Sequence, residues 1–426
     1  MQIRRDRSAL HFGRRARRRG PSWFFGFWFF SMAAAVMVIW QLDRVQPQVL
    51  AVVMGPPTPT TDAVTLAQLA EEAYWQGDLN NSILYYSQAY QMAPEDMGIM
   101  FEYVRNLVYG SYDGRGFGFR SERALEVAEE AIDDYPNDPR ALAAYTLALV
   151  AEGRGEEAAS AGIKAVDRAP DWAEPRAYLS MAYREQERWL NAQETAQKAI
   201  DLNPNSVDAR RALALAMAYT GEFDIAIGQF EQAIQAHPRL NVLYFELAPY
   251  YIVKGNFDAA IQAYDRVLGN DSRNVKAWTR KCETFFQQRN DISARESCEQ
   301  AVELDPTYPD AWKQLGMVQY TSRNYEGSII SFQRCVELMT NDGWTLEEQL
   351  GECYTYQGLA NQLLARCDLA VPLFEIGLQT EPSDTLKTFI YRGLELCIAS
   401  DTNYSGYQVP TAVPPTAIPP EPIGIY

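Results

Sequence analysis

The chain has 426 residues, of which 38 are basic and 55 are acidic, so its formal net charge at pH 7 is −17. The charge is uneven: residues 1–61 carry nine arginines and two aspartates, and the remainder holds 29 basic and 53 acidic residues. An acidic body argues against nucleic-acid binding, which needs a basic surface to replace the counterions of phosphates. We interpret most of the acidity as solvated helix faces.

The first 61 residues divide into three predicted segments. Residues 1–20 hold eight arginines and form a basic segment. Residues 21–41 contain an uncharged apolar run, Trp23 to Trp40, whose 18 residues are long enough for a helix that crosses a bilayer. We predict an uncleaved signal-anchor helix there, with a cleaved signal peptide as the alternative. Residues 42–61 are rich in proline and threonine and are predicted to form an extended stalk.

The arginine cluster also predicts an orientation. Basic segments next to a membrane helix stay on the cytoplasmic side. We therefore expect a single-pass protein of the plasma (inner) membrane, with its N-terminus in the cytoplasm and everything after Gln41 outside the cytoplasm.

A 34-residue period runs through the body of the chain. Prolines recur at one position of this period, and small residues recur at two other positions, where they would let paired helices approach closely. The prolines are Pro136, Pro170, Pro204, Pro238 and Pro306, and the small-residue columns are Ala158, Ala192, Ala226, Ala260, Ala294 and Ala165, Ala199, Ala233, Val267, Ala301. A period of this length is typical of a repeated pair of helices.

The best single copy of the period holds Trp312, Leu315, Gly316, Tyr325 and Phe332. With these residues the chain resembles the tetratricopeptide-repeat family. The resemblance implies an all-α fold, a right-handed α-solenoid of about nine helix-turn-helix repeats plus a capping helix. In this chain the predicted transmembrane helix precedes the solenoid. We expect the solenoid to cover residues 62–400.

The repeats are expected in chain order, with two irregular copies. The second copy has an eight-residue excess at Gly110–Phe119, which we interpret as an insertion because a helix, not a strand, precedes it. The ninth copy starts near Trp344 and is expected to use Leu350 and Gly351 as its Leu-Gly pair. The predicted ranges are 63–96, 97–138, 139–172, 173–206, 207–240, 241–274, 275–308 and 309–342 for the first eight copies, 384–399 for the cap and 401–426 for a disordered proline-rich tail.

The resemblance also implies a partner-binding surface, because the first helix of each repeat in this family lines a concave groove. Aromatic, methionine and arginine side chains at these places would contact a protein or peptide partner. The candidates are Tyr74, Trp75, Phe101, Arg105, Tyr109, Leu147, Met181, Arg184, Arg211, Leu215, Tyr219, Phe245, Ile252, Phe286, Met317, Tyr320 and Tyr356. No repeat has an asparagine at the ninth position of its first helix, so a clamp that binds a C-terminal carboxylate is not expected. Pro249 is expected to kink its helix.

Catalytic chemistry is not expected. The chain has two histidines, His11 and His237, and we interpret His237 as a capping or packing residue at a helix end. Adjacent acidic residues such as Glu129 and Glu130 point in different directions on a helix, so they do not form a catalytic pair. We predict no enzyme activity, no cofactor, no metal site and no small-molecule substrate.

All six cysteines lie beyond residue 280. An even number outside the cytoplasm allows disulfides. Cys282 and Cys298 would lie on the two helices of one repeat, and Cys367 and Cys397 would meet across adjacent antiparallel helices. The alternative is that the cysteines are free and stand in for alanine at small-residue positions.

These expectations combine into a membrane-anchored, non-enzymatic scaffold for protein–protein interactions. By analogy at the level of the fold, its role would be bacterial envelope assembly or secretion. Two alternatives stay open. One is a receptor with its repeats in the cytosol, and the other is a carbohydrate- or cell-wall-binding module that uses the groove aromatics.

Overall fold

The computed structural model describes residues 62–113, 119–400, 402–404 and 406–408. The repeats belong to the unit that starts at Asp62. The predicted basic segment, signal-anchor helix and stalk, at residues 1–61, lie outside the described residues, as does the tail from residue 409. Within the described part of the chain, every helix is too short or too polar to span a membrane.

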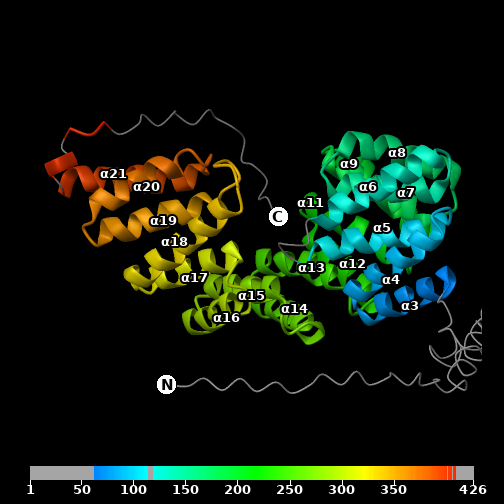
Figure 1. Cartoon of the computed structure of the whole chain (residues 1–426), viewed down its shortest axis with the longest axis horizontal. Helices are drawn as coiled ribbons and strands as arrows, with labels where there is room; N and C mark the ends of the chain where they lie inside the picture. The colour runs from blue at the N-terminus through cyan, green and yellow to red at the C-terminus, as the bar shows by residue number, and fades with distance from the viewer. Residues whose placement is uncertain (1–61, 114–118, 401, 405, 409–426) are drawn as a thin grey trace, which may run out of the picture. The chain divides into compact units, whose positions relative to one another are not determined.

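The described residues form nineteen α-helices, one short 3-10 helix and no strand (Figure 1). The helices are α3 (Ala63–Gln76), α4 (Leu79–Met92), α5 (Met97–Ser111), α6 (Phe119–Asp134), α7 (Pro139–Ala151), α8 (Gly155–Arg168), α9 (Ala173–Glu185), α10 (Trp189–Leu202), α11 (Val207–Tyr219), α12 (Phe223–Ala236), α13 (Asn241–Val253), α14 (Phe257–Asn270), α15 (Val275–Gln287), α16 (Asp291–Leu304), α17 (Pro309–Thr321), α18 (Tyr325–Asn341), α19 (Gly351–Leu363), α20 (Cys367–Gly377), α21 (Asp384–Ser400) and η1 (Thr402–Tyr404).

The helices pack as consecutive antiparallel pairs, α3 with α4 through α19 with α20, and α21 covers the last pair. The predicted all-helical repeat solenoid is therefore confirmed for the described residues. The side chains of the two small-residue columns, for example Ala158 and Ala165, are fully buried.

In most repeats the turn between the two helices holds one residue in the left-handed conformation, and from Gly153 to Arg323 this residue recurs every 34 residues. Glycine supplies it in some copies, because glycine has no Cβ to clash there. Other copies use residues that pay a steric cost in this conformation. The positions are Gly77, Gly153, Glu187, Gly221, Gly255, Arg289, Arg323 and Ala365.

Repeat nine begins later than the sequence predicted. A Cβ on Gly316 would lie 2.7 Å from the ring of Phe332, and a Cβ on Gly358 would lie 2.7 Å from the ring of Phe374 in the same arrangement. Gly358, not Gly351, is thus the small residue that admits the ring of the second helix. The prediction of Leu350 and Gly351 was wrong because Gly351 is instead the first residue of α19, and the extra residues precede that helix.

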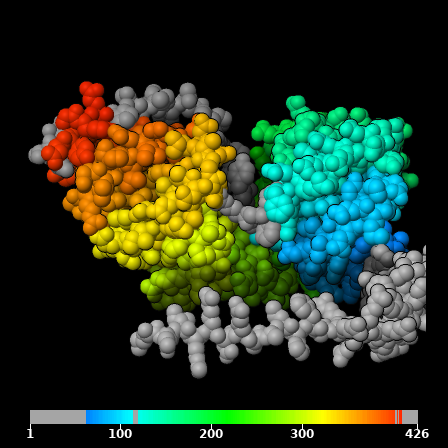
Figure 2. Space-filling model, in the orientation of Figure 1, coloured from blue at the N-terminus to red at the C-terminus, as the bar shows by residue number. Residues whose placement is uncertain are grey.

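The apolar core is continuous over the first half of the solenoid. One large cluster of buried side chains runs from α3 to α13, beside a small separate cluster on α7–α9, whereas the clusters on α13–α21 are all small. Helix α13 continues through Pro249 from Asn241 to Val253. Figure 2 shows the surface that results over both stretches, coloured along the chain.

Candidate partner-binding site

The first helices of repeats one to six do not form the solvent-exposed groove that the sequence predicted. Eight of the predicted groove residues on these helices are buried. They are Tyr74, Phe101, Tyr109, Leu147, Met181, Arg211, Leu215 and Phe245. The chain itself covers these side chains, so a partner can reach them only if the described structure opens.

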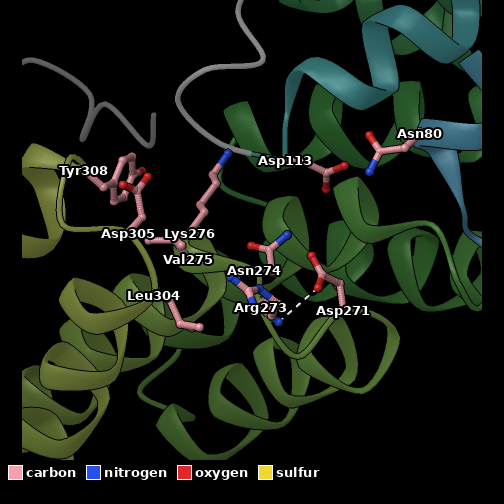
Figure 3. A pocket seen from close by; sticks show the side chains of 10 residues that line it. All are labelled: Asn80, Asp113, Asp271, Arg273, Asn274, Val275, Lys276, Leu304, Asp305 and Tyr308. Carbon is pink, nitrogen blue, oxygen red and sulfur yellow. Dashed lines mark hydrogen bonds between the residues drawn. The ribbon is translucent and has the colours of Figure 1, made fainter. Parts of the chain in front are cut away.

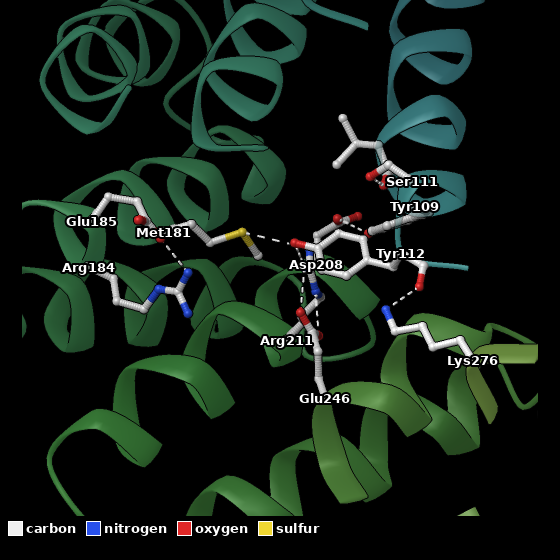
Figure 4. Close-up of polar contacts among 11 residues, drawn as sticks. Tyr109, Ser111, Tyr112, Met181, Arg184, Glu185, Asp208, Arg211, Glu246 and Lys276 are labelled. Atoms are coloured by element: carbon white, nitrogen blue, oxygen red, sulfur yellow. Dashed lines mark hydrogen bonds and ion pairs between the residues drawn. The ribbon is translucent and has the colours of Figure 1, made fainter. Parts of the chain in front are cut away.

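A polar network crosses the inside of this stretch (Figure 4). The hydroxyl of Tyr109 on α5 donates to the carboxylate of Asp208 on α11, 99 residues later, and Arg105 Nη1 lies 3.4 Å from the other carboxylate oxygen. Asp208 is 1% exposed. Burial raises the pKa of the Tyr109 hydroxyl well above its usual value, which keeps it protonated as the donor.

A second part of the network is centred on Arg211. Its guanidinium donates to both carboxylate oxygens of Glu246, at 2.7 and 2.6 Å, and to the hydroxyl of Tyr112 at 3.0 Å. A paired Arg–carboxylate interaction of this kind is strong and directional. It joins α11 to α13, and through Tyr112 it joins both to the end of α5. Arg184, in contrast, pairs with its neighbour Glu185.

Repeat one also contacts the loop between α12 and α13. His237 Nε2 lies 3.0 Å from the backbone carbonyl of Tyr74 and must donate, since a carbonyl only accepts. The imidazole stacks on Trp75, with 4.9 Å between ring centroids, and Arg239 Nη1 donates to the carbonyl of Gln76 at 3.2 Å. Burial lowers the pKa of His237 to about 4, so the ring is neutral at pH 7.

Gly77 makes this approach possible. A Cβ at this position would lie 2.7 Å from both the Cβ and the carbonyl oxygen of Arg239. Helices α3–α13 therefore form a closed turn, in which the first two repeats bond to residues 99 to 163 positions further along. We use the name "closed turn" for α3–α13 below.

Lys276, the second residue of α15, adds a further contact to the closed turn. Its ammonium donates to the carbonyl of Tyr112 at 2.6 Å and lies 4.7 Å from the centroid of the Phe245 ring. Burial lowers the pKa of Lys276 to about 8.

A cavity of about 310 Å³ lies beside this lysine (Figure 3). Two of its polar side chains already make local hydrogen bonds. Asp271 accepts from the amide of Arg273 at 3.0 Å, and Asn274 caps α15 by accepting from the amide of Ala277 at 3.0 Å. We assign no ligand to it. Its lining is Asn80, Asp113, Asp271, Arg273, Asn274, Val275, Lys276, Leu304, Asp305 and Tyr308.

The remaining predicted groove residues are more accessible. Trp75 and Tyr219 are 52% and 42% exposed, although Trp75 stacks on His237 and Tyr219 stacks on Trp189. The others are half-buried: Arg105, Arg184, Ile252, Phe286, Met317, Tyr320 and Tyr356.

Three aromatic rings from the alternate helices α17, α19 and α21 follow one another beyond the closed turn. Tyr320 on α17 and Tyr356 on α19 have ring centroids 5.4 Å apart, and Tyr356 and Phe389 on α21 are 6.2 Å apart. Phe389 is 39% exposed. We call Tyr320, Tyr356 and Phe389 the aromatic row. The sequence prediction omitted Phe389 because it assigned that helix only a capping role.

Three disulfides link the helices of this same region. Cys282–Cys298 joins α15 to α16, Cys335–Cys353 joins α18 to α19, and Cys367–Cys397 joins α20 to α21, with Cα atoms 5.2, 6.4 and 5.6 Å apart. Two of these pairs are those that the sequence analysis gave as possible. The pair Cys335–Cys353, which joins the last helix of repeat eight to the first helix of repeat nine, was not predicted.

Part of the chain is similar to a known protein family. A family model described as tetratricopeptide repeat matches residues 179–241 and 245–309. No curated protein sequence matches the chain. The matched residues have the pattern of tetratricopeptide repeats, and the helix pairs on either side of them pack in the same antiparallel arrangement.

Several solved structures are similar to this chain. Yeast Tom70 covers 82% of this chain and 92% of its own, with a TM-score of 0.50 and 12% identity. The Cut9–Hcn1 hetero-tetramer of the APC/C covers 83% and 82%, with a TM-score of 0.48 and 13% identity. The human IFIT1 dimer with PPP-AAAA covers 75% and 83%, with a TM-score of 0.48 and 15% identity. At 12% identity, the likeness to Tom70 concerns the fold alone.

Proposed function

We propose that this protein is a membrane-anchored, non-enzymatic scaffold whose repeats bind partner proteins outside the cytoplasm. A solenoid of tetratricopeptide repeats is a scaffold for protein–protein interaction. In this proposal the anchor is the helix at residues 21–41, the repeats lie on the extracytoplasmic side of the membrane, and the role is envelope assembly or secretion.

The three disulfides are the observation that carries the extracytoplasmic part. Disulfides persist in oxidising compartments and are rare where thiol reductants act. Each one here is buried and links two packed helices, and together they span α15 to α21. This supports the orientation that the arginine cluster predicts and disfavours a receptor with its repeats in the cytosol.

The aromatic row supports a location for the docking surface. Because the closed turn fills its own interior, its buried aromatics are not offered to a partner. The rings of Tyr320, Tyr356 and Phe389 keep part of their surface exposed, and Met317 lies on the same helix as Tyr320. Half-exposed aromatic and methionine side chains give adaptable apolar contact to a partner segment.

A topology measurement tests the anchor and the side of the membrane. A reporter fused after Tyr426, combined with protease protection in sealed vesicles, should place the repeats outside the cytoplasm. A cytosolic reporter would contradict the proposal.

A crosslinking measurement tests the docking surface. A photo-crosslinking residue at Tyr320 should capture a protein partner in intact cells, whereas the same residue at Ile163 on α8, which is 44% exposed, should not. Carbohydrate binding is a second candidate, because sugar rings also pack on exposed aromatic faces. Retention of the purified protein on cell-wall polymer, abolished by Tyr356→Ala, would favour that candidate over a protein scaffold.

A further inference from the structure

The aromatic row has the chemistry that recognises proline-rich segments. A proline-rich segment takes up the extended polyproline II conformation on its own, so it loses little entropy on binding, and its rings pack against aromatic side chains. Tyr320, Tyr356 and Phe389 offer three ring surfaces in succession, and Tyr325 extends them at 5.6 Å from Tyr320.

The chain returns toward this row after its last helix. Cys397, near the end of α21, is bonded to Cys367 at the start of α20, so the two helices run antiparallel. The next residues run back along them, because the hydroxyl of Tyr407 donates to Glu375 Oε1 at 2.6 Å, and Glu375 lies eight residues further along α20.

This contact brings the last described residues to the end of α21 that carries Phe389. Gly377, two residues after Glu375, faces the start of α21: a Cβ there would lie 3.3 Å from Cδ1 of Ile390. Ile390 is the neighbour of Phe389 in the sequence. The last described contact, that of Tyr407, therefore lies two residues along α20 from the glycine that faces Ile390, the neighbour of Phe389.

The segment that follows has the matching composition. Residues 409–426 contain six prolines and a single charged side chain, Glu421, and they repeat a five-residue motif as Thr411–Pro415 and Thr416–Pro420, in which only Val413 is replaced, by Ile418. At about 3.1 Å per residue in polyproline II, these 18 residues span about 56 Å. The segment is therefore long enough to reach all three rings, which follow one another at 5.4 and 6.2 Å.

We propose that the proline-rich segment 409–426 binds the aromatic row of its own chain. The segment thereby covers the surface that the proposed function assigns to partners, and an external partner of this row must displace it. The regulatory consequence rests on the proposed function, whereas the intramolecular contact does not.

The contact is tested in the purified full-length protein by replacing Phe389 with the photo-crosslinking residue p-benzoylphenylalanine. After irradiation, mass spectrometry should find residue 389 joined to a peptide from 409–426 in protein of monomer mass. The matched control carries the same residue in place of Ile330 on α18, which is 66% exposed and outside the row. The control should show no crosslink to the segment.

Three results would overturn the proposal: no crosslink from position 389 to the segment, equal crosslinking from position 330, or crosslinks found in dimers alone, which would make the occupant a second copy. A further variant replaces Pro414, Pro415, Pro419 and Pro420 with alanine and leaves residues 62–408 unchanged. We expect the yield at position 389 to fall about tenfold, the change that a loss of about 1.4 kcal/mol of binding gives. An unchanged yield would contradict recognition of the prolines.

The experiment uses neither partner nor membrane. Its outcome is therefore independent of the topology and partner experiments that test the proposed function.

Discussion

The imidazole of His237 donates a hydrogen bond to the backbone carbonyl of Tyr74, 163 residues earlier in the chain. This contact lies between the first repeat and the loop after the fifth. It shows that the solenoid bonds to itself over α3–α13, so most of the apolar groove predicted for these repeats is an interior, not a binding surface.

The buried pair of Arg211 and Glu246 should be the most sensitive point of the closed turn. Arg211→Met leaves the Glu246 carboxylate buried without its partner, and we expect a loss of about 3–5 kcal/mol in the free energy of unfolding. Adding Glu246→Leu removes the orphaned charge and should recover much of this loss. Denaturant unfolding of the single and double variants measures both changes, and additive losses would contradict a direct coupling.

His237 predicts a pH dependence with a definite sign. Its pKa is about 4 in the folded protein against 6.5 for an unperturbed imidazole, so between these values the unfolded chain binds more protons. The stability contributed by the neutral ring is complete above pH 6.5 and is lost as the pH falls toward 4.

The control for this prediction is His237→Gln, whose amide can donate to the same carbonyl and does not titrate. The unfolding free energy of the native protein should fall relative to that of the variant by about 2 kcal/mol between pH 7 and pH 5. Burial raises the pKa of Glu102 and Glu174, which acts in the opposite direction, but both proteins share these groups. A constant difference across this range would exclude a buried neutral His237.

The register of repeat nine is tested by a pair of glycine substitutions. Gly358→Ala puts a Cβ 2.7 Å from the ring of Phe374, and we expect it to destabilise the protein by about 1–3 kcal/mol. Gly228→Ala in α12 meets nothing within 4 Å and should stabilise by about 0.5–1 kcal/mol, since alanine favours a helix interior. Thermal unfolding would show opposite shifts, and equal shifts would argue for the earlier register.

The left-handed turn residues predict a stabilising change. Arg323 has φ +61° in the turn between α17 and α18, where glycine avoids the Cβ clash. Arg323→Gly should therefore raise the unfolding free energy by about 0.5–1 kcal/mol. In the same turn of repeat five, the reverse change Gly221→Ala should lower it by a similar amount. Loss of stability in Arg323→Gly would argue against the left-handed conformation.

Reduction of the disulfides should loosen one half of the body selectively. The three bonds close loops of 16, 18 and 30 residues, and each such bond contributes about 2–4 kcal/mol. With reductant, amide hydrogen exchange should accelerate in α15–α21 and stay unchanged in α5–α11. Alkylation and mass spectrometry without reductant provide the control: six free thiols in the purified protein would remove the disulfides altogether.

The sequence predicts the helix pairs well because their determinants are local and repeated. The alanine columns and the 34-residue step fix where each pair packs, and Gly77 marks a turn directly. The Leu350–Gly351 pair misled the prediction because it matches the repeat pattern by chance next to an insertion. The start of α19 at Gly351 and the contact between Gly358 and Phe374 show the true register.

The closed turn could not be predicted from the same pattern. The curvature of a solenoid accumulates from small rotations between repeats, so the meeting of Tyr109 with Asp208 depends on all the repeats between them. Asp208 occupies a groove position of its helix, yet nothing local distinguishes it from a solvated aspartate. The aromatic and arginine residues were correctly placed on the first helices, but which of them face solvent depends on this closure.

The most direct test of the closed turn is a distance measurement across it. Spin labels at Glu72 on α3 and Gln235 on α12, both exposed and each two residues from the Tyr74–His237 contact, report the separation by pulsed electron resonance. The closed turn predicts one short and narrow distance distribution in the full-length protein. A long or broad distribution would show an open solenoid and would return the buried aromatics of α3–α13 to the binding surface.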